Sequence, residues 1–126
     1  MFSLTLGVIH YSFAQYCSSS STSASFCSTS LVSIGSLSNV SSGCANYSDY
    51  TSIYTELILN NTYNLTIGLD NCSGFTSPKI SNVYIDWNGN EIFDADEEVF
   101  HVNATSAIAA NQNNFNTTIT VPANAI

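Results

Sequence analysis

Short runs in which apolar and polar residues alternate predict a chain built from β-strands. Residues 63–69 show the pattern most clearly, because every second side chain is apolar. The runs lie at 31–37, 53–59, 63–69, 80–87, 99–102 and 115–121. An Asn-Asn-Thr turn separates the second run from the third, which predicts a hairpin. Short strands with turn residues between them predict an all-β fold with a single Ig-like or jelly-roll-like β-sandwich.

The N-terminal residues predict export. Residues 2–14 form a mostly apolar run that is too short to cross a bilayer, which takes about 20 residues. The run ends in Ser-Phe-Ala, a small-x-small pattern that signal peptidase cleaves, although no Lys or Arg precedes it. The alternatives are a start further upstream or a first strand. We therefore expect a signal peptide at 1–14, a Ser-rich segment pinned by cysteines at 15–30, and the β-sandwich at 31–126, in a protein that is secreted or on the cell surface and has no membrane span.

The charge of the chain excludes some partners. One Lys and no Arg stand against nine acids, so the net charge is −8. A protein that binds nucleic acid through its phosphates needs a basic surface, so we expect no nucleic-acid partner. Only 8% of the residues are charged, and Ser, Thr and Asn supply most of the polar side chains. Such a surface, with 44% hydrophobic residues, is typical of a secreted β-protein rather than a disordered chain.

Four cysteines follow the predicted cleavage point: Cys17, Cys27, Cys44 and Cys72. An even number in a small exported domain predicts disulfides, of which three pairings are possible. The simplest arrangement joins neighbours in the sequence, as Cys17–Cys27 and Cys44–Cys72. A zinc site is disfavoured because the chain has no C-x-x-C pair and His101 is the only His of the expected mature chain.

Residues 86–98, which we name the acidic loop, contain six of the nine acids and no Lys or Arg. Oxygen-bearing groups recur there at the spacing of the EF-hand calcium loop, whose seventh position uses a main-chain carbonyl. The predicted ligands are Asp86, Asn88, Asn90, Ile92, Asp94 and Glu97. Glu91 occupies the position where this loop normally has Gly. The pattern predicts one structural Ca²⁺ without the flanking helices of an EF-hand.

A solvated acidic hairpin is the alternative for the same residues. Asn88-Gly89 is a strong signal for a two-residue hairpin turn, which would pair Ile85 with Ile92. It would also place Asp86 opposite Glu91, a destabilising pair of like charges. Both alternatives remain open at the level of the sequence.

No catalytic group is apparent from the sequence. It has neither a G-x-S-x-G nor an H-E-x-x-H motif, and His101 lies in a strand-like run. We therefore expect a chain that is not an enzyme. Aromatic side chains could form a platform for an extracellular glycan or protein, the alternative being that they belong to the core, as most aromatics of a small sandwich do. The candidates are Tyr47, Tyr50, Tyr54 and Trp87.

Several motifs together resemble the GEVED domain of secreted bacterial proteins. They are Tyr16-Cys17, Gly43-Cys44 with the Tyr-Ser-Asp-Tyr-Thr run that follows, Thr62-Tyr63, the run Tyr84-Ile85-Asp86-Trp87-Asn88, and Val121-Pro122-Ala123. The resemblance covers residues 16–126 and is most specific at Ile-Asp-Trp-Asn. Two features depart from the family pattern: Glu91 replaces a Gly, and the chain has Asp96-Glu97-Glu98-Val99 instead of a literal Gly-Glu-Val-Glu-Asp.

The resemblance implies a non-catalytic β-sandwich module attached to neighbouring domains of an exported protein. The family pattern continues past Val-Pro-Ala, which implies that the last strand of the sandwich is missing here. The alternative function is a fragment of a secreted protease or other hydrolase whose catalytic domain lies outside this chain.

Overall fold

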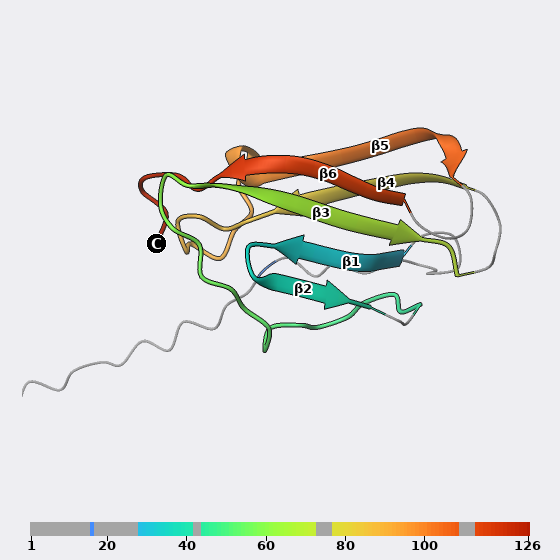
Figure 1. Cartoon of the computed structure of the whole chain (residues 1–126), viewed down its shortest axis with the longest axis horizontal. Coiled ribbons are helices and arrows are strands. Elements are labelled where there is room, and N and C mark those ends of the chain that lie inside the picture. The colour runs from blue at the N-terminus through green and yellow to red at the C-terminus, as the bar shows by residue number, and fades with distance from the viewer. Residues whose placement is uncertain (1–15, 17–27, 42–43, 73–76, 109–112) are drawn as a thin grey trace, which may run out of the picture.

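The computed structural model describes residue 16 and residues 28–41, 44–72, 77–108 and 113–126 (Figure 1). Six strands and one short 3₁₀ helix occur in these residues. They are β1 (Ser28–Ile34), β2 (Leu37–Val40), β3 (Thr62–Asp70), β4 (Ser77–Tyr84), η1 (Ala95–Glu97), β5 (Glu98–Ile108) and β6 (Asn113–Thr120).

The strands form two antiparallel sheets. The first has the order β2-β1-β3-β6, and the second pairs β4 with β5. Side chains from both sheets share one core, in which Val102 of β5 joins Leu65, Ile67 and Leu69 of β3. The expectation of an all-β sandwich is therefore confirmed.

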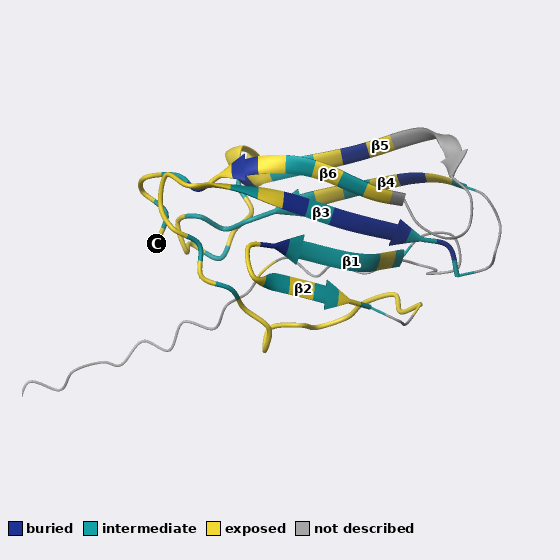
Figure 2. Ribbon diagram, viewed as in Figure 1, coloured by how far each residue is buried: buried dark blue, intermediate teal, exposed yellow. Residues whose placement is uncertain are grey.

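β3 is the central strand of the larger sheet. Its alternation places Leu65, Ile67 and Leu69 inward, where each is at most 3% exposed. Figure 2 shows the longest continuous buried stretch along this strand. On the opposite face the strands are held by hydroxyl and amide groups, as where the Thr66 hydroxyl donates to Asn116 Oδ1 at 2.8 Å.

The run at 31–37 is not one strand, as the alternation predicted, but a hairpin. β1 and β2 are joined by Gly35 and Ser36, and Ile34 pairs with Leu37. Gly35 has φ +58°, which L side chains rarely adopt, and a two-residue turn that begins with Gly matches the twist of paired strands. A Gly-Ser dipeptide inside the run was the signal for this turn.

The predicted strand at 53–59, and with it the hairpin to 63–69, is wrong. Both edges of β3 are already occupied, one by β1 and the other by β6, so the preceding segment has no free edge of β3 to join. It is instead held by side chains: the Ile58 N–H donates to the Tyr63 hydroxyl at 2.9 Å, and Leu57 packs against the core.

The other predicted strands differ from the structure mainly at their ends. β4 ends at Tyr84, three residues before the predicted limit, because the chain turns into the acidic loop at Asp86. β5 extends well beyond 102, and β6 begins two residues before 115. Among the residues described, no helix is long and apolar enough to span a bilayer.

One of the two expected disulfides is present. Cys44 and Cys72 are bridged, with 5.8 Å between their Cα atoms and a separation of 28 residues. Closing a loop of this size stabilises a fold by about 3–4 kcal/mol in the chain-entropy account. Cys17 and Cys27 lie outside the described residues, as does the predicted signal peptide.

The buried face of β3 predicts a large cost of truncation. Leu69 is 1% exposed, so Leu69→Ala is expected to lower the free energy of unfolding by about 2–5 kcal/mol through lost burial and a residual cavity. Ile80 on β4 is 65% exposed, and Ile80→Ala should cost less than about 1 kcal/mol. Urea unfolding measures both values, and equal losses would contradict the placement of the core.

Candidate functional site

The acidic loop connects β4 to β5 at one end of the sandwich. The Ile85 N–H donates to the Glu97 carbonyl at 3.1 Å, so the ladder between the two strands extends slightly past Tyr84. Between Ile85 and η1 the chain forms no strand, and Ile85 does not pair with Ile92. The Asn-Gly hairpin considered above is therefore not formed, and the loop closes through its own side chains.

The carboxylate of Asp86 organises the first half of the loop. Its Oδ1 accepts the N–H of Gly89 at 2.7 Å and that of Asn90 at 3.3 Å, while Oδ2 accepts the N–H of Glu91 at 2.9 Å. The Tyr16 hydroxyl also donates to Oδ2, at 3.0 Å. Main-chain N–H groups thus curl around one carboxylate.

The asparagines at the third and fifth positions repeat this turn on a smaller scale. Asn88 Oδ1 accepts the N–H of Asn90 at 2.9 Å, and Asn90 Oδ1 accepts the N–H of Ile92 at 2.8 Å. The Nδ2 groups of both asparagines donate to Asp94 Oδ2, at 3.5 and 3.0 Å. The structure therefore brings the third, fifth and ninth positions of the predicted register together.

Glu97, the twelfth position, closes the loop from inside the protein. It is 2% exposed, and its two oxygens accept the N–H of Trp87 at 2.9 Å and the N–H of Asp94 at 3.1 Å. Like the Asp86 carboxylate, this carboxylate is stabilised by main-chain donors. The residue ends η1, so the short helix fixes its position.

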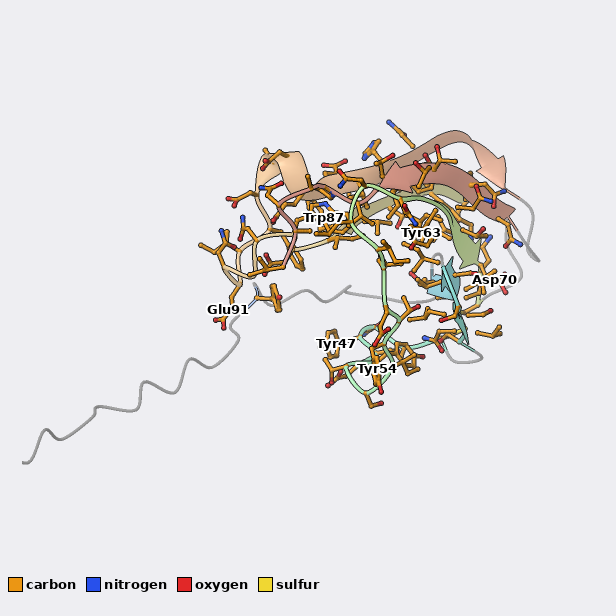
Figure 3. All side chains as sticks on the ribbon, turned by 60° about the vertical axis from the view of Figure 1, so that its left-hand side comes forward. Tyr47, Tyr54, Tyr63, Asp70, Trp87 and Glu91 are labelled. Carbon is orange, nitrogen blue, oxygen red and sulfur yellow. A yellow bond between two sulfur atoms is a disulfide. The ribbon has the colours of Figure 1, made fainter. Side chains whose placement is uncertain are left out.

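The loop departs from ordinary backbone geometry at two positions. Gly89 has φ +66°, a conformation that L side chains rarely adopt, so a substitution there would be strained. Glu91 has φ +67°, in the left-handed region. A side chain other than glycine costs about 1–2 kcal/mol there, and this is the position where the calcium loop normally has Gly. In Figure 3, Glu91 lies at the outer end of the loop.

Hydrogen bonding shifts the pKa values of two groups at the loop. Burial by itself raises the pKa of Asp86, but donors from Glu91, Tyr16, Gly89 and Asn90 outweigh burial and hold this pKa below its ordinary value. The pKa of Tyr16 is raised, first by its hydrogen bond to Asp86 and then by burial and nearby acids. Charge on Asp86 is thus favoured by the fold.

Aromatic contacts attach the loop to the rest of the chain. The ring of Phe93 stacks on Tyr16 with centroids 4.8 Å apart and lies 5.4 Å from the ring of Tyr84. Phe93 also borders an open, mainly apolar groove between β1, β3 and β4. The role of Tyr16 was missed from the sequence, since 70 residues separate it from Asp86 and no spacing rule links them.

The carboxylates do not form a metal site by themselves. Within the described part of the chain, no three side chains from His, Cys, Asp and Glu are grouped so as to hold a metal ion. Asp86, Asp94 and Glu97 are instead occupied with N–H donors of the loop. A cation there would also need the asparagine oxygens and the carbonyl of Ile92.

The predicted aromatic platform is only partly assembled. Tyr47 and Tyr54 are 65% and 84% exposed, and Tyr50 is exposed with its hydroxyl donating to Ser41 Oγ at 2.9 Å. All three belong to residues 44–59, which we name the tyrosine segment. Trp87 packs against the core and lies far from Tyr47 and Tyr54 in Figure 3. The structure therefore separates Trp87 from the tyrosines.

Comparison with protein-family models finds a match in the part of the chain that contains the acidic loop. The family model of the GEVED domain matches residues 81–126. This range includes every residue of the predicted calcium register and confirms the resemblance over that part of the chain. GEVED domains are small accessory domains, which fits a non-catalytic module. No curated protein and no solved structure gives a significant match.

The lowered pKa of Asp86 predicts a pH-dependent contribution to stability. A carboxyl group with a depressed pKa stabilises the fold fully above its unfolded value of about 3.9, and this stabilisation is lost as the pH falls through the lower folded value. In EDTA, the stability difference between wild type and Asp86→Asn should therefore shrink as the pH falls below about 4.

Urea unfolding at a series of pH values measures this difference. Tyr16→Phe removes one of the donors to Asp86 and should produce a smaller change of the same sign. A difference between wild type and Asp86→Asn that stays constant down to acid pH would contradict the assignment.

Proposed function

We propose that this chain is a non-catalytic extracellular module of a larger exported protein and that its acidic loop holds one structural Ca²⁺. The family match supports the first part of the proposal. The observation that carries the second part is the Asp86 carboxylate, around which three main-chain N–H groups are turned. The Cys44–Cys72 bridge supports an oxidising, extracellular location.

The loop offers the hard oxygen atoms that Ca²⁺ prefers. A side-chain carbonyl oxygen has two lone pairs, so Asn88 and Asn90 can keep their N–H bonds and still contribute oxygen to an ion. Asp94 accepts both amide donors at Oδ2, so its other carboxylate oxygen could also contribute to the shell. Asp86, Glu97, the Ile92 carbonyl and water would complete a shell of six to eight oxygens, as Ca²⁺ requires.

The charge of the loop favours this occupant. Six acids lie in thirteen residues without a Lys or Arg among them, and a divalent cation would relieve their mutual repulsion. Glu91 in the left-handed conformation works in the opposite direction, because it strains the turn that the ion needs. We therefore expect weak binding, with a dissociation constant of about 10⁻⁴–10⁻³ M, as in other extracellular modules.

Calcium should raise the thermal stability of the chain. At ten times the dissociation constant, an ion that binds only the folded state stabilises it by about 1.4 kcal/mol. Melting in EDTA and in stepped CaCl₂ measures this rise, and MgCl₂ should give a smaller one because Mg²⁺ demands tighter octahedral geometry. Asp86→Ala and Glu97→Ala are expected to abolish the rise. The proposal fails if wild type shows no rise up to tens of millimolar, or if both variants retain it.

Two further variants separate binding from general effects of charge. Glu56→Ala removes an exposed acid outside the acidic loop and should leave the rise caused by calcium unchanged. Glu91→Gly removes the left-handed strain, so it should stabilise the calcium-free chain by about 1 kcal/mol. The same variant should shift the calcium dependence to lower concentrations. A loss of stability in Glu91→Gly would contradict the role assigned to this position.

Binding of an extracellular glycan is the second function that we propose for the module. The tyrosine segment exposes several large side chains together, including Tyr47, Tyr54 and Ile58. Planar aromatic faces suit the apolar faces of sugar rings. A fragment of a secreted protease remains the alternative for the parent protein, and an H-E-x-x-H motif in the same open reading frame would favour it.

Co-sedimentation with insoluble cellulose and chitin tests the glycan proposal. Wild type should be retained on at least one of them. The double variant Tyr47→Ala/Tyr54→Ala should weaken binding by about five- to 150-fold, since each lost aromatic contact is worth about 0.5–1.5 kcal/mol. Ile80→Ala, which changes an exposed side chain on β4, is the matched control and should be retained normally. Absence of retention on both polymers, or equal retention of all three proteins, would contradict glycan binding.

A further inference from the structure

The only Lys of the chain lies inside the protein. Lys79 occupies a core-facing position of β4, in line with Ser81 and Val83, and it is 1% exposed. Lysine is among the residues that are least often fully buried, because an ammonium loses its hydration there. Lys79 belongs neither to the acidic loop nor to the tyrosine segment.

The amine of Lys79 contacts the side-chain amide of a second buried residue. Its Nζ lies 2.9 Å from Asn71 Oδ1, and Asn71, which directly follows β3, is 7% exposed. The Ser77 hydroxyl donates to the same Oδ1 at 3.1 Å. A potential nucleophile and a hydrogen-bond donor thus converge on one amide group, which is withdrawn from bulk water.

We propose that Lys79 and Asn71 form an intramolecular isopeptide bond in the folded chain. The Lys79 amine attacks Cγ of Asn71, a C–N bond forms between Nζ and Cγ, and the bond from Cγ to Nδ2 breaks. One proton passes from Nζ to the leaving nitrogen, which departs as ammonia, or as ammonium when the lysine begins protonated. The product is a secondary amide, and no oxidant or other reactant is consumed.

Two features of the site favour this reaction, in which the neutral amine is the nucleophilic form. The Ser77 hydroxyl is placed to stabilise the negative charge that develops on Oδ1 during the attack. The fold holds the two side chains together, so the reaction is effectively intramolecular and gains from this proximity.

The product would also crosslink one end of the sandwich. The new bond would join the end of β3 to β4 across eight residues, and Asn71 is next to Cys72 of the disulfide. This end of the sandwich would then have two covalent links, one sensitive to reducing agents and one resistant to them.

Trypsin tests the proposal on the wild-type protein. Lys79 is the only Lys or Arg of the 126 residues, so it provides the only tryptic site. After folding, the chain is denatured, reduced, alkylated and digested. A crosslinked Lys79 resists cleavage, so we expect an intact chain whose mass is lower by one ammonia than the sequence predicts. Two fragments, 1–79 and 80–126, at the unmodified mass would overturn the proposal.

Matched variants exclude other causes of resistance. Lys79→Arg retains a tryptic site and a positive charge but lacks the primary amine, so it should be cut after denaturation and show the full mass. Asn71→Ala should likewise be cut, whereas Asn64→Ala, which changes an exposed asparagine of β3, should remain uncut. Cleavage of Asn64→Ala together with Asn71→Ala would contradict the assignment of Asn71. The wild-type digest decides the matter even where a variant fails to fold.

Discussion

The burial of one face of β3 is the constraint on which the rest of the sandwich depends. This strand is paired on both edges, so its backbone groups are satisfied within the larger sheet. Leu65, Ile67 and Leu69 then form an apolar surface that only a second layer can cover, and the sheet of β4 and β5 supplies that layer. β4 and β5 are neighbours in an antiparallel ladder. The acidic loop must therefore connect the end of β4 to the start of the strand beside it.

The loop meets this requirement with polar groups rather than with apolar packing alone. The carboxylates of Asp86 and Glu97 accept main-chain N–H groups, so unpaired backbone donors and negative side chains satisfy each other. Elsewhere hydroxyls and amides play the corresponding part, as in the pair of Thr62 and Thr120 across β3 and β6. A chain with one Lys and no Arg has few ion pairs to use, and its polar order depends on these neutral groups.

Sequence pattern predicted the parts of the fold in which local and global requirements agree. The alternation in residues 63–69 gave β3, because a half-buried strand requires that pattern. It failed at 53–59, since the pattern says nothing about whether a sheet edge is free. The alternation also failed to predict the turn at Gly35, where one glycine interrupts the strand that its neighbours favour.

The candidate site was likewise predicted only in part from the sequence. The register from Asp86 to Glu97 was visible in the sequence because one short segment carries all of it. The contribution of Tyr16 was not, because it arises from tertiary contacts to Asp86 and Phe93. The inward position of Lys79 was missed for another reason: the predicted strand began at residue 80, one residue after it, whereas β4 begins at Ser77.

The hydrogen bonds that order the loop also limit what a cation can add to it. A loop already turned around Asp86 would lose little conformational freedom on binding a cation, which would favour affinity. Its carboxylates are also partly satisfied without the ion, because Asp86, Asp94 and Glu97 already accept hydrogen bonds within the loop. Glu91 adds strain that a glycine would not. The turn already formed around Asp86 favours binding of a cation, whereas the strain at Glu91 and the existing hydrogen bonds oppose it. A cation would therefore reinforce a connection that the protein has already formed.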